Sequence, residues 1–256
     1  MPNSDFFSSP SGGKDSSTDL NKVSRFSTQT INGVDNLLFR VMTPNETGSD
    51  GIGHLATVTG ALSQLPSPIL SNLRDNDVRW IVTHDSPDQG FPEANLTAPI
   101  AQNHPEAWPN GKDIGDMSSM YVNASARPGL RPNTVVIGTE NPQGDSSFNV
   151  TLHETGHAYD DISGGLSKSQ KFMQAYLSDV PNMTGPTDAT DDNPSDAYYL
   201  PQTTPNDAGR GARETFAEGF ARFYGSDPDL QKDWPNMYRF WQDYSAAQRN
   251  AARFGK

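Results

Sequence analysis

One pentapeptide restricts the fold of this sequence more than any other feature: residues 153–157 read His-Glu-Thr-Gly-His. Each residue of a helix turns by about 100°, so His153 and His157 would lie one above the other on the same face. Both imidazoles could then reach one tetrahedral zinc ion at about 2.0–2.1 Å. Glu154 would lie beside the position of a bound water and could take its proton. The pentapeptide therefore predicts a helix that carries two zinc ligands.

The residues around the pentapeptide favour a helix over about 147–162. Ser146 or Ser147 is expected to cap its start, because a serine hydroxyl accepts a hydrogen bond from a free N–H group of the first turn. Gly164 and Gly165 are expected to end it. The apolar stripe at helical spacing consists of Phe148, Leu152 and Tyr159. The alternative is a solvent-facing helix with unrelated histidines, although chance placement gives only on the order of 0.003 such pentapeptides in this composition.

A catalytic zinc site needs a third protein ligand and leaves one position open for water. The metzincin spacing is excluded, because it requires Gly at 160 and His at 163, where this chain has Asp160 and Ser163. On an unbroken helix Asp160 would rise about 10 Å above His153, too far to close the same site. We expect Asp160 to be solvated or to cap, and the third ligand to come from elsewhere in the chain.

Glu214 is the better candidate for the third ligand. It lies with Glu218 on one face of a helix expected over 211–225. The apolar face of that helix is formed by Phe216, Phe220 and Phe223. Two carboxylates four residues apart repel each other unless a cation compensates them. A zinc ion bound by Glu214, together with a ligand imidazole that donates its N–H to Glu218, would supply that compensation. The alternative is a solvated face of an amphipathic helix, but only seven residues of this Asp-rich chain are Glu, and Glu154 is another of them.

An H-E-x-x-H helix followed by an E-x-x-x-E helix resembles the gluzincin zinc metallopeptidases. Residues 214–220, Glu-Thr-Phe-Ala-Glu-Gly-Phe, look most like the anthrax lethal factor catalytic domain and the Pro-Pro endopeptidase family. The resemblance implies a zincin-like fold with one Zn²⁺ per chain and a protein or peptide substrate. It implies His153, His157 and Glu214 as metal ligands, Glu154 as general base and Glu218 as the partner of a ligand imidazole.

The resemblance is specific over residues 146–162 and 211–224 only, and it fails at one position. In that family a tyrosine about two helical turns before the ligand glutamate helps to hold the oxyanion, and this chain has Asp207 there. The residues that could replace it are Tyr198, Tyr199, Arg210 and Arg213. The two tyrosines could equally be packing residues that pin the loop.

The order of the expected elements predicts an α+β fold with two lobes. Residues 1–30 are rich in serine and are expected to form a disordered leader. Residues 31–145 would form an N-terminal lobe with a small mixed sheet and a helix, and residues 146–256 a helical lobe that binds zinc. The expected strands are 37–42, 78–83, 120–123 and 134–138. The expected helices are 52–74, interrupted at Pro66 and Pro68, then 147–162, 167–178, 211–225 and 229–253.

We expect a substrate to lie extended between the lobes and to add a strand beside Thr134–Gly138. In gluzincins the substrate-binding edge precedes the zinc helix, as this segment does. The remaining histidines, His54, His84 and His104, are expected to be structural. The acidic cluster within residues 188–196 lacks the ligand order of a calcium loop and is expected to be solvated.

The net charge and the composition limit the classes of molecule that the protein is expected to bind. A net charge of −12 without a segregated basic patch disfavours nucleic acid. No apolar run approaches the roughly 20 residues that span a membrane, and cysteine is absent, which excludes thiolate ligands. We expect a monomeric zinc endopeptidase, with a zinc-stabilised binding module or pseudoprotease without turnover as the alternative.

The composition of residues 1–30 is the basis for a prediction of localisation. The serine-rich composition of residues 1–30 and the overall size are similar to zinc-protease effectors that plant-pathogenic bacteria inject through type III secretion. The resemblance implies a secreted effector or toxin that acts on a host protein. The alternative is that residues 1–30 are only a frayed terminus.

Overall fold

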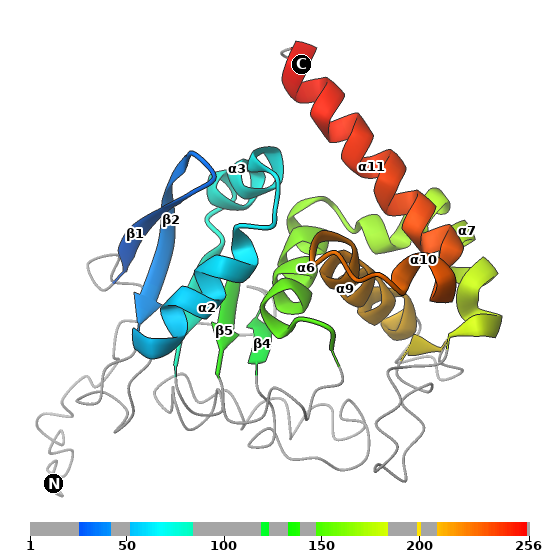
Figure 1. Ribbon diagram of the computed structural model, residues 1–256, viewed down its shortest axis with the longest axis horizontal. Helices are drawn as coiled ribbons and strands as arrows, with labels where there is room; N and C mark the ends of the chain where they lie inside the picture. Colours follow the sequence, from blue (N-terminus) through cyan, green and yellow to red (C-terminus); the bar gives the residue numbers. More distant parts are fainter. Residues whose placement is uncertain are drawn as a thin grey trace, which may run out of the picture.

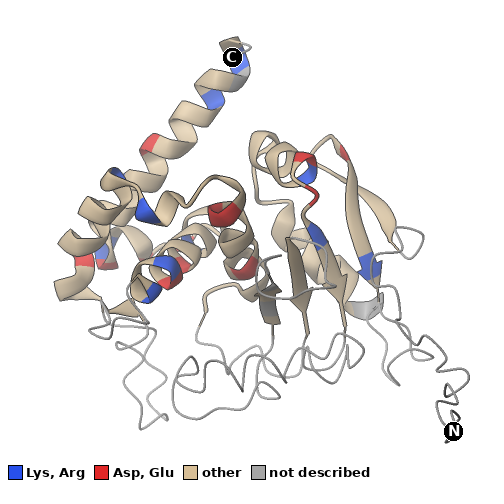
Figure 2. Ribbon diagram, turned by 180° about the vertical axis from the view of Figure 1, so that it is seen from behind, with Lys and Arg blue, Asp and Glu red and all other residues tan. Residues whose placement is uncertain are grey.

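A computed structural model of the chain describes residues 26–41, 52–83, 119–122, 133–138, 147–183, 199–200 and 209–254. A mixed sheet with helices α2 and α3 forms one end of the molecule, and helices α7, α9, α10 and α11 gather at the other end (Figure 1). Helix α6 lies between the two ends and packs on both the sheet and α9. Seen from behind, the strands lie side by side and the C-terminal helices stand apart from them (Figure 2). The α+β class predicted from the element order is confirmed.

The sheet has five strands among the described residues, in the order β1-β2-β3-β5-β4. The central strands β2, β3 and β5 are parallel, and β1 and β4 pair antiparallel at the two edges. Their bounds are β1 Ser27–Ile31, β2 Val34–Val41, β3 Arg79–Val82, β4 Ser119–Val122 and β5 Thr134–Ile137. The expectation that a substrate adds a strand beside Thr134–Gly138 is wrong, because β3 and β4 occupy the two sides of β5. Among the described strands, β4 lies at this edge of the sheet.

One face of the sheet fixes the position of α6. Phe39, Trp80 and Val135 are neighbours across three parallel strands, and all three are fully buried. The Phe39 and Trp80 rings stack with their centroids 5.2 Å apart. The Trp80 indole N–H donates to Thr155 Oγ1 of α6 at 3.1 Å. The helix that carries the His-Glu-Thr-Gly-His pentapeptide is therefore anchored to the middle of the sheet.

Most predicted elements are found within a few residues of their expected bounds. The helices are α2 Ile52–Leu62, α3 Ser67–Asp75, α6 Val150–Ile162, α7 Gln170–Asp179, α9 Arg210–Tyr224, α10 Leu230–Asp233 and α11 Pro235–Phe254, with 3₁₀ turns at Leu166–Lys168 and Val180–Asn182. The predicted interruption at Pro66 and Pro68 is confirmed, since α2 and α3 are separate helices. No helix in the described ranges is long and apolar enough to span a membrane.

Two predicted boundaries are wrong. The single helix expected over 229–253 divides into α10 and α11, because Pro235 lacks the N–H group that would continue α10 and instead begins α11. Residues 27–30, expected in the leader, belong to β1, which pairs with β2. The rest of the expected leader, residues 1–25, lies outside the described residues.

A buried carboxylate fixes the start of α11. Asp179, which is fully buried, accepts hydrogen bonds from Asn236 N at 2.9 Å, Asn236 Nδ2 at 2.7 Å and Met237 N at 2.8 Å. These N–H groups lie in the first turn of α11, where a helix supplies no acceptors of its own. Asp179 therefore joins the end of α7 to the start of α11.

We expect Asp179→Ala to lower the free energy of unfolding by about 2 kcal/mol, because it removes the acceptor and leaves buried N–H groups without a partner. Thermal unfolding followed by circular dichroism should show a fall in Tm of about 4–8 °C. Asp179→Asn keeps one carbonyl acceptor and should lose less. An unchanged Tm for Asp179→Ala would contradict this role.

Candidate metal centre

Helix α6 begins at a different cap from the one expected. Asn149, not Ser146 or Ser147, caps it by accepting a hydrogen bond from Leu152 N at 3.0 Å. Phe148 lies before the helix and is 45% exposed, so it is not part of the apolar stripe. The end of the helix is as predicted: Gly164 and Gly165 follow it with φ of 78° and 80°, a left-handed backbone that glycine adopts readily.

The glycine inside the pentapeptide lets α6 and α9 touch backbone to backbone. A Cβ atom added to Gly156 would lie 3.0 Å from Ala217 Cα and 3.2 Å from Ala217 O, both on α9. Those distances are tighter than normal side-chain packing allows. The close approach brings Glu214 of α9 to the face of α6 that carries His153 and His157.

We expect Gly156→Ala to destabilise the protein by about 1–3 kcal/mol, because the added methyl group forces α6 and α9 apart. A matched control is Gly60→Ala in α2, where nothing lies within 4 Å of an added Cβ. That change should be neutral or raise the stability, since alanine is the better helix former. Chemical denaturation of both variants measures the difference, and equal stabilities would contradict the tight crossing.

Three ligand atoms converge at the crossing of α6 and α9. His157 Nε2 lies 3.2 Å from His153 Nε2 and 3.1 Å from Glu214 Oε2, and His153 Nε2 lies 3.4 Å from the same Glu214 oxygen. A tetrahedral zinc ion with bonds of about 2.0–2.1 Å separates its ligands by about 3.3–3.4 Å. The three atoms thus outline one face of such a tetrahedron. Among the described residues, this group can hold a metal ion.

Glu218 fixes the orientation of one of these imidazoles. Its carboxylate lies 3.0 Å from His153 Nδ1, and it also accepts from Ser147 Oγ at 2.7 Å and Phe148 N at 2.9 Å. A carboxylate only accepts, so the proton of the ring lies on Nδ1. In the neutral ring Nε2 then keeps its lone pair, which points toward Glu214 and His157. The contacts of Ser147 and Phe148 with Glu218 were not expected from the sequence, because they join residues about 70 positions apart.

Glu154 lies beside the cluster and is nearly buried, with 8% of its surface exposed. Burial raises the pKa of its carboxyl above 4.5, and the neighbouring His153 and His157 oppose that rise. Its Oε1 accepts a hydrogen bond from Ser119 Oγ of β4 at 3.0 Å. The contact with Ser119 was also missed, since nothing in the sequence relates a serine to a glutamate 35 residues later.

The electrostatics of the cluster favour a cation. Burial alone would raise the pKa of Glu214, but His157 and His153 hold it well below 4.5. Burial alone would lower the pKa of His153, but its hydrogen bonds with Glu214 and Glu218 hold it well above 6.5. Three carboxylates surround two imidazoles here, so neutral imidazoles leave an excess of negative charge that a divalent cation can neutralise.

The residues proposed for the oxyanion are not all described. Tyr198 and Asp207 lie outside the described residues. Tyr199 is buried, its ring centroid lies 5.6 Å from that of Trp234, and its carbonyl accepts from Tyr176 Oη at 2.7 Å. These contacts match the alternative of a packing residue. Arg213 is exposed on α9.

The other candidates are either absent from the cluster or outside the described residues. Asp160 was expected to be solvated or to cap, and its burial excludes the solvated role. It accepts from Ser167 N at 2.7 Å and Ser167 Oγ at 2.6 Å in the 3₁₀ turn Leu166–Lys168, which fits the capping role. His84, His104 and the acidic residues of 188–196 are outside the described ranges. None of these three predictions is tested.

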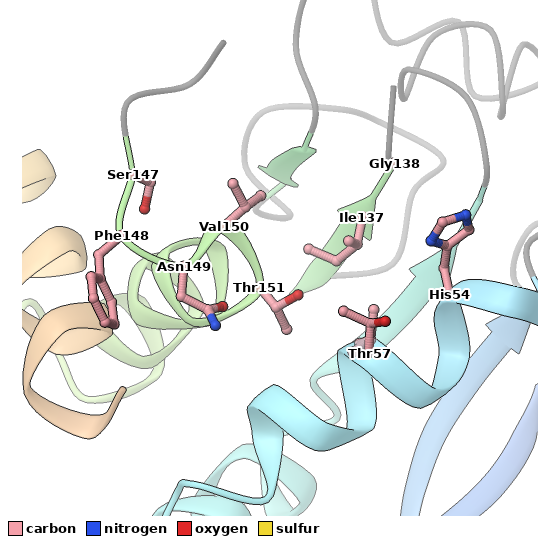
Figure 3. Close-up of a pocket in the computed structure, with 10 residues that line it drawn as sticks. His54, Thr57, Ile137, Gly138, Ser147, Phe148, Asn149, Val150 and Thr151 are labelled. Atoms are coloured by element: carbon pink, nitrogen blue, oxygen red, sulfur yellow. The ribbon is translucent and has the colours of Figure 1, made fainter. Parts of the chain in front are cut away.

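His54 lies in a hollow of about 310 Å³ between the first turn of α6, the end of β5 and α2 (Figure 3). Ser147 and Phe148, which bind Glu218, form part of its wall. The wall also includes Val58, Ile137 and Val150. His54 therefore faces a surface hollow and is not one of the three clustered metal-ligand candidates.

Comparisons with known proteins support the fold alone. No known family model and no curated protein sequence matches the chain. A solved structure, that of a Pro-Pro endopeptidase from Paenibacillus alvei, is similar with a TM-score of 0.54 and 20% sequence identity. The match covers 75% of this chain and 91% of that one. This chain therefore shares its α+β architecture with an endopeptidase over most of the length of both.

Proposed function

We propose that this protein is a zinc-dependent endopeptidase with one Zn²⁺ per chain, held by His153, His157 and Glu214. The observation that carries the proposal is the triangle of Nε2, Nε2 and Oε2 atoms with edges of 3.1–3.4 Å, which matches three corners of a zinc tetrahedron. The fourth corner would remain for water, since no fourth side chain joins the group among the described residues.

A zinc ion bound there supplies a Lewis acid, which lowers the pKa of water to about 7 and polarises a carbonyl oxygen. Glu154 takes the proton of the water that attacks the scissile carbonyl and passes it to the leaving nitrogen as the C–N bond breaks. Glu218 holds the proton on His153 Nδ1 and so keeps Nε2 available as a ligand. Ser147 and the Phe148 N–H keep the Glu218 carboxylate in place.

A peptide substrate would lie along β4, which replaces β5 as the proposed substrate-binding edge. Among the described strands β4 pairs with β5 on one side only, so an extended peptide can add to its other side through backbone hydrogen bonds. The similar solved structure is named for cleavage at Pro-Pro, and peptides with that pair are the natural first probes. Export as a bacterial effector, with type III injection and a host target, stays a prediction from the serine-rich leader.

The test begins with metal analysis of the purified protein, followed by incubation with a peptide mixture that includes Pro-Pro sequences. We expect one zinc per chain and cleavage that a chelator stops and added zinc restores. Failure to bind zinc at stoichiometry would overturn the proposal. One bound zinc without cleavage of any peptide would favour the alternative, a zinc-stabilised binding module.

A further inference from the structure

Among the described side chains of the edge strand β4, one reaches the proposed general base. Ser119 is buried at the start of β4, and its hydroxyl donates to Glu154 Oε1 at 3.0 Å. Ser119 is aligned with Ile137 of β5 in the antiparallel pair, so its side chain points to the face of the sheet on which α6 packs. In the described part of the chain, this is the one hydrogen bond that the Glu154 carboxylate receives.

A second contact holds the same strand against α6. Tyr121 lies two residues after Ser119, so both side chains point to the same face of the sheet. Its hydroxyl lies 3.1 Å from Asp161 Oδ2 on α6 and 3.0 Å from Asn133 Oδ1 beside β5. Within the described residues, two contacts therefore fix the position of β4 along α6, and of these only the Ser119 contact involves Glu154.

We propose that Ser119 is a positioning residue that orients the Glu154 carboxylate from the strand beside which the peptide lies. The proposal rests on the proposed peptidase function. With Oε1 held by the serine, the carboxylate cannot rotate freely about its last bond, and Oε2 is the oxygen left to receive a proton from water. The orientation of the Glu154 carboxylate would then depend on the position of β4, the same strand that would align the scissile bond of the peptide.

Ser119→Ala is the direct test, measured on the zinc-loaded enzyme. We expect kcat to fall about 10-fold with KM unchanged within about twofold, because the peptide still pairs with β4 while the base is misaligned in a fraction of molecules. The zinc content should stay at one per chain. Ser119→Thr keeps the hydroxyl and should recover most of the lost kcat.

The matched control is Ser167→Ala. Ser167 has the same burial as Ser119, and its hydroxyl also donates to a buried carboxylate of α6, that of Asp160. The chemical change is therefore identical, but it lies away from Glu154, and kcat should remain within about twofold of wild type. An equal loss of kcat in both variants would indicate a general loosening of α6 and would overturn the positioning role.

A second readout needs no metal. In the zinc-free protein we expect Ser119→Ala to lower Tm by about 4 °C, and by about 1 °C or less in a Glu154→Ala background, where the serine has lost its partner. Additive shifts would contradict the contact. If wild type cleaves and Ser119→Ala cleaves equally well, only the positioning role fails; if wild type cleaves nothing, the proposed function fails and the role of Ser119 with it.

Discussion

Glu154→Gln is expected to lower kcat by about 10²–10⁴-fold while the protein keeps one zinc per chain, because an amide of the same shape cannot accept the proton of the attacking water. The side chain is nearly buried beside His153 and His157 and is not one of the three clustered ligand candidates. Its replacement should therefore leave the metal-binding atoms where they are. Cleavage of a peptide substrate, followed by mass spectrometry, measures the loss.

The controls for this prediction separate chemistry from folding. Zinc content and Tm of the variant should match wild type within the error of the measurement, since the amide can still accept the hydrogen bond from Ser119. Peptide affinity should also persist, which makes the variant suitable for trapping a bound substrate. Cleavage at the wild-type rate would show that another group moves the proton, and the mechanism proposed for Glu154 would be wrong.

The part of the candidate site that lies on one helix could be predicted, because helical spacing relates residues close together in the sequence. Residues 153–157 lie on one helix, and helical geometry alone aligns His153 with His157. Glu214 lies 57 positions after His157, yet it could be chosen because two carboxylates on one helix face require a cation. The structure brings Glu214 to both imidazoles, within 3.4 Å of each. Its role as a ligand stays a prediction until metal is measured.

The contacts that tie these helices to the sheet could not be predicted. Ser119 and Ser147 reach glutamates 35 and 71 positions away, and neither contact leaves a trace in the periodicity of the sequence. The order of the strands in the sheet could not be predicted from local sequence either. Both β4 and β5 were expected as strands, but a four-residue segment does not specify which strand lies at the edge. For that reason an added strand was expected beside β5, on a side that β4 occupies.

Prolines divide helices at two places in the part of the chain that the structure describes. Pro66 and Pro68 predict an interruption of the helix expected over 52–74, and α2 and α3 are separate helices. Pro235 divides the helix expected over 229–253 in the same way, and that boundary was not predicted. The same proline that ends one helix is well suited to begin the next, since its fixed φ fits the first helical turn. The requirement for glycine at position 156 could not be predicted from the sequence. It arises from the close contact of α6 with α9, where a side chain at 156 would collide with Ala217.

Glu214→Ala is the second change with a large expected effect. It removes one of three proposed ligands and leaves two imidazoles, which can no longer close the site, so we expect less than about 0.2 zinc per chain after dialysis and no peptide cleavage. Elemental analysis of the purified variant beside wild type measures the loss directly. Circular dichroism should show that the fold persists, because α9 is held mainly by the buried faces of Phe216 and Phe220.

Glu218→Ala is the control that distinguishes loss of a proposed zinc ligand from loss of the residue that orients a ligand imidazole. Glu218 contacts His153 Nδ1 and not the open side of the cluster, so its loss should weaken zinc binding by about 10–100-fold without abolishing it. At saturating zinc this variant should regain one metal per chain, and Glu214→Ala should not. If Glu214→Ala instead retained one zinc per chain after dialysis, the carboxylate would not be a ligand, and the site would have to be closed by a residue outside the described parts of the chain.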